Sequence, residues 1–358
     1  MIKKARGQIL VPEIKKPVKI DLKDRKIIKC LEFNSRLSLT QIAKKVRLSK
    51  EVVFHRIKNL INKGLIINFY TVIDTKKFNF QIYEVVFKLK STKKEKREIF
   101  INYLIEHPLI SWVMEHGGKN DFIVDICSSN AEQFQSTLFE ILNNFQEIIY
   151  DYETDLVLTK YRSSMKYLPR LNLNLSFKRD KEAFLQEFNK KIEKTDLDKK
   201  DLEILDLLEI NARYSLAELS RKLKISRDTI KYKIKKMIRQ GVIKGFQLRL
   251  NSILLGFQPA TLFLRLRVLN KEEEKKIIDF LLSHIPINLV FNKIGRWNYF
   301  AKIYFKNNYE LDQLINSIRE RLGEKLIDSE VIIQFSQYKF TYLPEGILGN
   351  LKENLTNK

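Results

Sequence analysis

The stretch NARYSLAELSRKLKISRDTIKYKIKKMIRQGVIKGF, residues 211–246, has a counterpart at residues 34–69, NSRLSLTQIAKKVRLSKEVVFHRIKNLINKGLIINF. The two stretches are 177 residues apart, and 18 of the 49 positions aligned between 21–69 and 198–246 are identical. The same offset continues downstream in three pairs of residues: His107 and His284, Gly118 and Gly295, and Tyr161 and Tyr338. The chain is therefore a tandem duplication of one unit of about 150 residues, which predicts a pseudo-twofold arrangement.

Each copy begins with a pattern typical of a helix-turn-helix. Apolar residues at helical spacing predict three short helices, and the second and third are separated by only three residues. Asp21 and Asp198 are placed to cap the first helix, and Ser49 and Ser226 are placed to cap the third. The β-rich stretch 65–73 follows the third helix and is predicted to form the wing of a winged variant.

After each helix-turn-helix unit, the periodicity predicts the order β-α-β-β-α-β of a ferredoxin-like sandwich. In the first copy, the predicted strands are 82–89, 110–114, 122–127 and 148–158, and the predicted helices are 94–106 and 131–142. In the second copy, the predicted strands are 261–268, 287–294, 299–305 and 327–337, and the predicted helices are 272–282 and 309–322. A four-stranded sheet of this kind leaves one face uncovered, so we expect the two sheets to pack on each other.

The predicted fold class is α+β, with two winged helix-turn-helix domains alternating with two βαββαβ domains. The helix-turn-helix domains are assigned to residues 20–74 and 196–251, and the βαββαβ domains, of a sensor or dimerisation type, to residues 80–162 and 258–343. The remaining segments are a basic N-terminal arm at 1–19, a semi-rigid connector at 163–195 with a charged helical stretch at 178–193, and a disordered tail at 344–358.

The charge of the chain and its position favour nucleic acid as the partner. A net charge of +23, from 66 Lys and Arg against 43 Asp and Glu, attracts polyanions. Basic residues on a helix can simply be solvated, but here they fall on the outward face of the third helix in both copies. The predicted DNA-binding residues are Ser49, Lys50, His55, Arg56, Lys58, Ser226, Arg227, Lys231, Tyr232, Lys233 and Lys235. Base contacts are expected from Lys50, His55, Arg227, Lys231 and Tyr232, and phosphate contacts from Arg56, Lys58, Lys233 and Lys235.

The sequence of these helices, with its capping and turn residues, resembles that of the DNA-binding domain of the leucine-responsive regulator/AsnC family, also called feast/famine regulators. The matching residues in the second copy include Asp198-x-x-Asp201, Asn211-Ala212-Arg213-Tyr214-Ser215 and Gly241-Val242-Ile243-x-Gly245-Phe246, and in the first copy Val53-x-x-Arg56-Ile57-x-x-Leu60-x-x-x-Gly64. The resemblance implies βαββαβ domains that dimerise and sense small effectors, commonly amino acids. Family members usually carry one unit, so the resemblance implies a dimer fused into one polypeptide.

The family pattern places a Gly-x-x-Asp turn between the second and third strands of the sensor domain. The first copy has Gly118-Lys119-Asn120-Asp121, and the second has Gly295-Arg296-Trp297-Asn298. The resemblance suggests effector binding near Gly118, Asp121, Gly295 and Asn298, although turn geometry alone also explains these residue types. The absence of an aspartate at position 298 argues against a second equivalent effector site.

Two other functions stay open at this point. Siroheme decarboxylases resemble the same family and act on a tetrapyrrole with His and Arg residues near the second and third strands. The sensor domains contain His107, His116 and His284, but two of these recur at a helix end, where a histidine is commonly a structural cap. The sequence shows no phosphate-binding glycine loop, metal-spaced cluster or nucleophile with its base, so we predict no catalytic residue, metal or cofactor. A pure assembly module is opposed by the basic third helices.

The cysteines and the apolar runs indicate the compartment. Cys30 and Cys127 lie in apolar segments and have no counterpart in the other copy, which is typical of buried thiols in a reducing cytosol. No apolar run approaches the length of a membrane span. We therefore expect a cytoplasmic protein whose partner is double-stranded DNA. The operator, the effector, the sign of regulation and any further homo-oligomerisation are not encoded in a readable motif.

Overall fold

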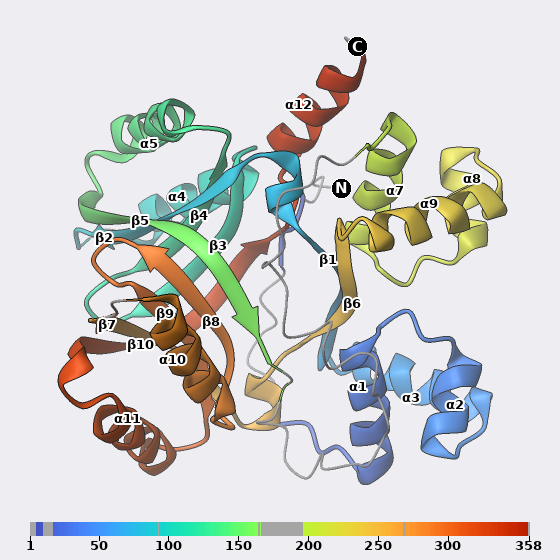
Figure 1. The fold of residues 1–358 in the computed structure, drawn as a ribbon, viewed down its shortest axis with the longest axis horizontal. Coiled ribbons are helices and arrows are strands. Elements are labelled where there is room, and N and C mark those ends of the chain that lie inside the picture. The colour runs from blue at the N-terminus through green and yellow to red at the C-terminus, as the bar shows by residue number, and fades with distance from the viewer. Residues whose placement is uncertain are drawn as a thin grey trace.

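The computed structural model describes residues 5–9, 17–91, 93–163, 165, 196–267 and 270–356. Two three-helix units lie on one side of the molecule, and an eight-stranded barrel lies on the other (Figure 1). A two-stranded ribbon lies between them. The predicted helix at 178–193 lies outside the described residues.

Both three-helix units have the predicted helices and caps. The helices are α1 (Leu22–Phe33), α2 (Leu39–Val46), α3 (Lys50–Asn62), α7 (Lys199–Ile210), α8 (Leu216–Leu223) and α9 (Arg227–Arg239). Side chains of Asp21 and Asp198 accept hydrogen bonds from backbone N–H groups of the first helices. The turn before each third helix begins at a residue in the left-handed region, Arg47 (φ 56°) or Lys224 (φ 54°). This backbone conformation reverses the chain within three residues.

The predicted wing is a strand in each copy, but its partner is the other copy. Strand β1 (Ile66–Ile73) pairs antiparallel with β6 (Ile243–Leu250), so neither unit forms a wing hairpin by itself. Tyr70 lies opposite Gln247, its own counterpart 177 residues later, and the Tyr70 hydroxyl donates to the Gln247 Oε1 at 2.8 Å. The pseudo-twofold axis therefore passes through this pair.

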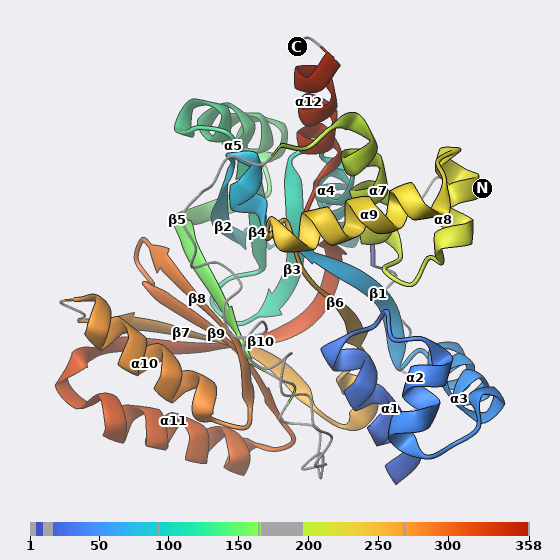
Figure 2. The same ribbon diagram turned by 45° about the vertical axis from the view of Figure 1, so that its right-hand side comes forward.

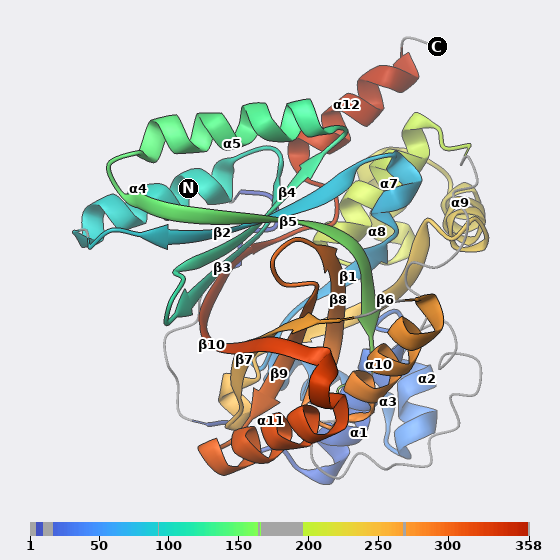
Figure 3. The ribbon, with the colours of Figure 1, turned by 60° about the vertical axis from the view of Figure 1, so that its left-hand side comes forward.

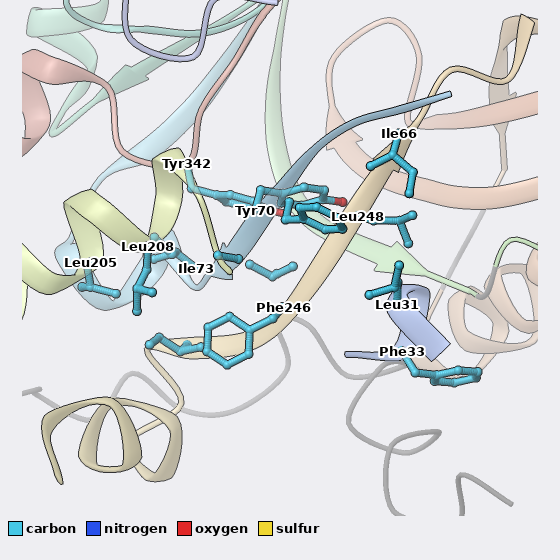
Figure 4. Packing of buried hydrophobic residues seen from close by; sticks show 14 of the residues in the cluster. Leu31, Phe33, Ile66, Tyr70, Ile73, Leu205, Leu208, Phe246, Leu248 and Tyr342 are labelled. Atoms are coloured by element: carbon cyan, nitrogen blue, oxygen red, sulfur yellow. The ribbon is translucent and has the colours of Figure 1, made fainter. Parts of the chain in front are cut away.

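Each three-helix unit contacts the ribbon strand that belongs to the other copy, and the two units flank the ribbon in Figure 2. The first helix of each unit packs on the ribbon strand of the other copy, α1 on β6 and α7 on β1. The exchange is reciprocal in detail, because the Ser35 N–H donates to the Phe246 carbonyl and the Ala212 N–H donates to the Phe69 carbonyl. Figure 4 shows the side chains that pack there, with Leu205 and Leu208 beside the end of β1.

The two βαββαβ sheets close into one barrel. Its strands are β2 (Gln81–Leu89), β3 (Ile110–Gly117), β4 (Phe122–Ser128), β5 (Ile149–Arg162), β7 (Gln258–Leu266), β8 (Ile287–Ile294), β9 (Tyr299–Phe305) and β10 (Leu326–Phe340), in the order β10-β3-β4-β2-β5-β8-β9-β7. Strands β5 and β10 pair with both halves, so the sheets join at two seams (Figure 3). The expected burial of the uncovered faces is achieved by this closure, which also removes exposed strand edges.

Helices and an interior aromatic cluster complete the barrel. Helices α4 (Lys94–Glu106) and α5 (Ala131–Phe145) cover the first sheet, and α10 (Lys271–Ser283) and α11 (Asn308–Leu322) cover the second. Short 3-10 turns occur at η1 (Thr75–Phe78), η2 (Ile253–Leu255) and η3 (Gly323–Lys325). The barrel interior contains a separate cluster that includes Trp112, Phe263, Phe291, Trp297 and Phe300.

The ends of the chain differ from the prediction. The tail expected to be disordered contains helix α12 (Glu345–Thr356), which packs on α7 and buries Ile347 and Leu348. Near the N-terminus, Arg6 forms ion pairs with Asp206 and Glu209 of α7. Both ends therefore pack on α7, and the tail forms a helix because α7 offers an apolar surface that lies far from it in the sequence.

Candidate nucleic-acid interface

Helices α3 and α9 begin at capped serines that lie at the surface. The Ser49 hydroxyl accepts a hydrogen bond from the Val52 N–H at 3.2 Å, and the Ser226 hydroxyl accepts from the Thr229 N–H at 3.1 Å. Both serines are exposed. Each helix therefore presents its N-terminus, with its partial positive charge, to solvent.

Helix α9 carries the stronger concentration of positive charge. Arg227, Lys231, Lys235 and Arg239 are exposed, and none of them forms an ion pair with any residue that the structure describes. Tyr232 is 60% exposed between them. These cations keep their hydration and their charge available to an external polyanion.

Helix α3 presents a different surface. Lys50 and Lys58 are exposed, and Glu51 adds a negative charge in the first turn, as Asp228 does in α9. His55 is also exposed, and its ring packs edge-on against Phe54 at a centroid distance of 5.5 Å. The first unit therefore offers fewer cations and a larger aromatic surface than the second.

Two residues predicted to contact phosphate, Arg56 and Lys233, have their charges paired inside their own units. The Arg56 Nη1 lies 2.9 Å from an oxygen of Asp21 and 2.7 Å from one of Asp24. At the equivalent place, the Lys233 Nζ lies 2.5 Å and 3.1 Å from the carboxylates that cap α7, those of Asp198 and Asp201. Burial opposes the charge of Lys233, but these hydrogen bonds outweigh it and raise the pKa of the lysine. Arg56 and Lys233 therefore fix the third helix to the first.

The four residues suggested for effector binding are engaged in turn geometry. The Asp121 carboxylate accepts a hydrogen bond from the Leu89 N–H at 2.9 Å. Asn298 binds the equivalent backbone, accepting from the Leu266 N–H at 2.8 Å and donating to the Leu266 carbonyl at 2.7 Å. At Gly295, a Cβ atom would lie only 1.7 Å from an Asp155 oxygen, and Gly118 has φ 133°. None of the four residues lines a cavity described below.

Sequence reasoning missed a pair of arginines that connect the units. The Arg36 guanidinium donates to the carbonyls of Ala212 and Tyr214, and the Arg213 guanidinium donates to those of Ser35 and Leu37. Their recurrence in both copies was visible in the sequence, but the partners lie in the opposite copy. Burial lowers the pKa of both arginines, yet their hydrogen bonds to carbonyls hold the units together across the axis.

A cavity of about 190 Å³ lies between the ribbon and the barrel. Side chains from β1, β5, β6, β9 and β10 line it, among them Tyr70, Arg162, Arg249 and Lys302. This cavity was not predicted from the sequence. One signal was available, because Lys302 interrupts the apolar alternation of β9 between Phe300 and Tyr304.

The histidines of the barrel make structural contacts. His116 is buried, its Nε2 lies 3.1 Å from the Thr261 hydroxyl, and burial lowers the pKa of His116 to about 3. The His107 Nδ1 accepts from the Leu109 N–H at 3.2 Å, and His284 contacts the Phe280 carbonyl and Ser317. Within the described ranges, no three His, Cys, Asp or Glu side chains gather as metal ligands. In the same part of the chain, no helix combines the length and apolarity needed to cross a membrane.

Comparison with known proteins identifies the class. A model of winged helix-turn-helix DNA-binding domains matches residues 20–67 and 197–244. An uncharacterised HTH-type transcriptional regulator of Pyrococcus horikoshii is 32% identical over 133 residues, which span 36% of this chain and 86% of that protein. The HTH-type transcriptional regulator FL11 of the same organism is 30% identical over 132 residues, which span 37% of this chain and 81% of FL11.

These matches define a winged helix-turn-helix DNA-binding protein with two copies of the DNA-binding unit. The chain belongs to the leucine-responsive regulator/AsnC family of transcriptional regulators, as a tandemly duplicated member. Each relative aligns with little more than a third of the chain, which is about the length of one copy of the duplicated unit.

A solved structure resembles the chain over nearly its whole length. The siroheme decarboxylase NirDL superposes with a TM-score of 0.60 and covers 94% of this chain and 98% of its own, at 12% sequence identity. At this identity, the likeness concerns the fold alone.

Proposed function

We propose that the chain binds double-stranded DNA as an intrachain pseudo-dimer, with α3 and α9 entering the major groove at two half-sites. The observation that carries this proposal is the placement of two capped, solvent-facing third helices on either side of the pseudo-twofold axis at Tyr70 and Gln247. Helix-turn-helix dimers use this arrangement to read two half-sites. The residues assigned to the interface are Ser49, Lys50, His55 and Lys58 of α3 and Ser226, Arg227, Lys231, Tyr232 and Lys235 of α9. The exposed Arg239 at the end of α9 adds a further positive charge on this side.

Helices α3 and α9 expose different side chains, so the DNA site that they bind should be asymmetric. A homodimer presents identical helices and selects a palindrome, but this chain offers His55 and Phe54 in one half and Tyr232 and Lys231 in the other. Both sets of side chains are exposed. The unit containing α9 is proposed to supply most of the electrostatic affinity, because it carries the larger number of exposed cations that form no ion pair with the described residues.

The substitutions His55→Ala and Tyr232→Ala test this assignment. We expect each one to relax base preference in a different half-site, by about 1–3 kcal/mol where the side chain touches a base edge. The measurement is selection of bound fragments from random DNA, performed with the wild-type chain and with each variant. Lys275→Ala, on the exposed face of α10, is the control and should leave the selected sequence unchanged. A perfect palindrome, or an equal effect of either substitution on both half-sites, would contradict the assignment.

We propose that the chain acts as a regulator and not as an enzyme, because its barrel histidines are engaged in structural hydrogen bonds. The likeness to NirDL keeps a tetrapyrrole enzyme as the competing candidate. Purified chain mixed with siroheme decides between them. Under our proposal the Soret band of siroheme stays in place and no decarboxylated product forms. An amino-acid effector near the Gly118 to Asp121 turn stays a prediction of the sequence, and DNA as the partner implies action in the cytoplasm.

A further inference from the structure

The cavity between ribbon and barrel contains positive charge without a matching carboxylate. No carboxylate of a described residue pairs with Lys302 or Arg249, both of which line the cavity. Burial, together with the nearby charges of Arg249 and Arg162, lowers the pKa of Lys302 to about 7. Two cations that repel each other in a low-dielectric environment are costly unless an anion compensates them.

Arg249 is only partly satisfied by its surroundings. Its guanidinium lies 4.3 Å from the ring centroid of Phe340 and 5.3 Å from that of Tyr70. Its Nη1 is buried and makes no hydrogen bond with any described residue. Buried donors of this kind are nearly always bonded in folded proteins, so an unpaired guanidinium nitrogen indicates a missing acceptor.

The cavity also contains hydrogen-bond acceptors and apolar walls that a bound ligand would contact. The Oδ1 of Asn288 and the Oε1 of Gln334 are buried and accept no hydrogen bond from the described residues. Both can accept from a hydroxyl group. The walls also include Trp112, Phe291 and Pro259, which suit a short carbon skeleton. The volume of about 190 Å³ accommodates roughly a dozen water-sized groups at about 15 Å³ each.

The equivalent positions in the other copy do not repeat this arrangement. Asp125 stands where the second copy has Lys302, and its carboxylate pairs with the Lys160 Nζ at 3.3 Å. Val72 stands where the second copy has Arg249. The unpaired cations therefore belong to one side of the pseudo-dimer, and the symmetric fold does not require them.

We propose that this cavity binds one small organic dianion, either a hydroxylated dicarboxylate or a phosphate monoester, whose acidic groups pair with Lys302 and Arg249. The anion supplies the acceptor that Arg249 lacks, and its hydroxyl reaches Asn288 or Gln334. Arg162 is already held by the Tyr70 hydroxyl at 2.9 Å and by Gln247 at 2.8 Å, and it contributes charge at the edge of the site. This inference goes beyond DNA binding and does not depend on it.

Isothermal titration of the full-length chain without DNA tests the proposal. The probes are malate for a dicarboxylate and glycerol 3-phosphate for a phosphate monoester, with acetate, leucine and inorganic phosphate as comparisons. We expect one of the two dianions to bind with one site per chain, and Lys302→Met and Arg249→Met each to weaken it at least tenfold. Lys275→Met, which removes an exposed lysine, is the matched control and should bind as the wild type does.

The pH dependence separates a specific site from general attraction. The groups that face Lys302 are Arg249, Arg162 and Lys160, the phenols of Tyr70, Tyr304 and Tyr342, and His116 behind Thr261. Burial and the nearby arginines lower the pKa of Lys302 to about 7, so Lys302 loses its charge as the pH rises through that value. Affinity for malate, which is mostly a dianion over this range, should therefore fall from pH 6 to pH 9 in the wild type and stay level in Lys302→Arg, which keeps its charge.

Thermal melting keeps the test valid if a variant folds poorly. The bound dianion should raise the melting temperature of the wild type and of Lys302→Arg, but not that of Lys302→Met. The proposal is overturned if neither dianion binds below millimolar concentration, if the two methionine variants bind as tightly as the wild type, or if inorganic phosphate binds as tightly as both organic probes.

Discussion

Replacing Lys293 by methionine is expected to destabilise the folded chain by about 3–5 kcal/mol, the cost of breaking a buried ion pair from one side. The Lys293 Nζ lies 2.6 Å from the Glu84 Oε1 and 2.7 Å from the Asp155 Oδ2, and all three side chains are almost completely buried inside the barrel. Without the lysine, two buried carboxylates lose their counter-charge. The loss should appear as a lower denaturant midpoint in equilibrium unfolding.

The pH dependence of that variant follows from the same contacts. Burial raises the pKa of Glu84 and of Asp155, and Lys293 opposes this increase. In Lys293→Met, both carboxyl groups should bind protons more tightly in the folded state than in the unfolded state. Stability of the variant should therefore fall as pH rises and recover toward pH 5.

Two control variants test whether the loss of stability comes from the carboxylates left without a counter-charge. Lys276→Met removes an exposed lysine that pairs with Glu272 and should change stability by less than about 0.5 kcal/mol. The triple variant Glu84→Gln, Asp155→Asn, Lys293→Met removes all three charges and should be more stable than Lys293→Met alone. A single variant within 1 kcal/mol of the wild type would show that water or relaxation solvates the carboxylates.

Removing the four exposed cations of α9 that form no ion pair with the described residues is expected to weaken DNA binding by two to three orders of magnitude, about the loss of four contacts to phosphate charge. The substituted residues are Arg227, Lys231, Lys235 and Arg239, all exposed and without an ion pair to the described residues. The slope of log K against log salt should decrease by about 3.6, at about 0.9 per contact. Fluorescence anisotropy at several salt concentrations measures both quantities.

A charge-matched control distinguishes a local interface from the overall positive field. Alanine at Lys94, Lys119, Lys275 and Arg319 removes the same charge from exposed positions of the barrel. This variant should retain most of the affinity and nearly the whole salt slope. Equal losses in the two variants would mean that DNA is held by net charge and not by α9.

Local sequence signals predicted the elements well, because their causes are local. Serine and aspartate caps, glycine stops and alternating strands depend on residues within a few positions of each other, and helix 94–106 and strand 287–294 have the predicted bounds. The pairing of β1 with β6 joins the two copies, and the docking of α12 on α7 joins segments far apart in the second copy. No short-range pattern encodes such contacts.

The candidate site was predicted less completely than the fold. Residues such as Lys231 and Tyr232 are exposed as expected, since an unpaired polar face is visible in a helical pattern. Arg56 and Lys233 have the same residue types but point to carboxylates of the first helix. A sequence shows which residues are basic, but it does not show which of them already have a partner in space.

The buried ion pairs of Lys293 with Glu84 and Asp155 mean that neither copy can replace the other. Glu84 and Asp155 come from the first copy and Lys293 from the second, whereas their counterparts in the opposite copy are Thr261, Ile332 and His116. Two first halves brought together would bury four carboxylates without a lysine, and two second halves would bury two lysines without a carboxylate. Each half has therefore become an obligate subunit of the other. A recombination event that overwrote one copy with its twin would restore sequence symmetry and abolish the barrel.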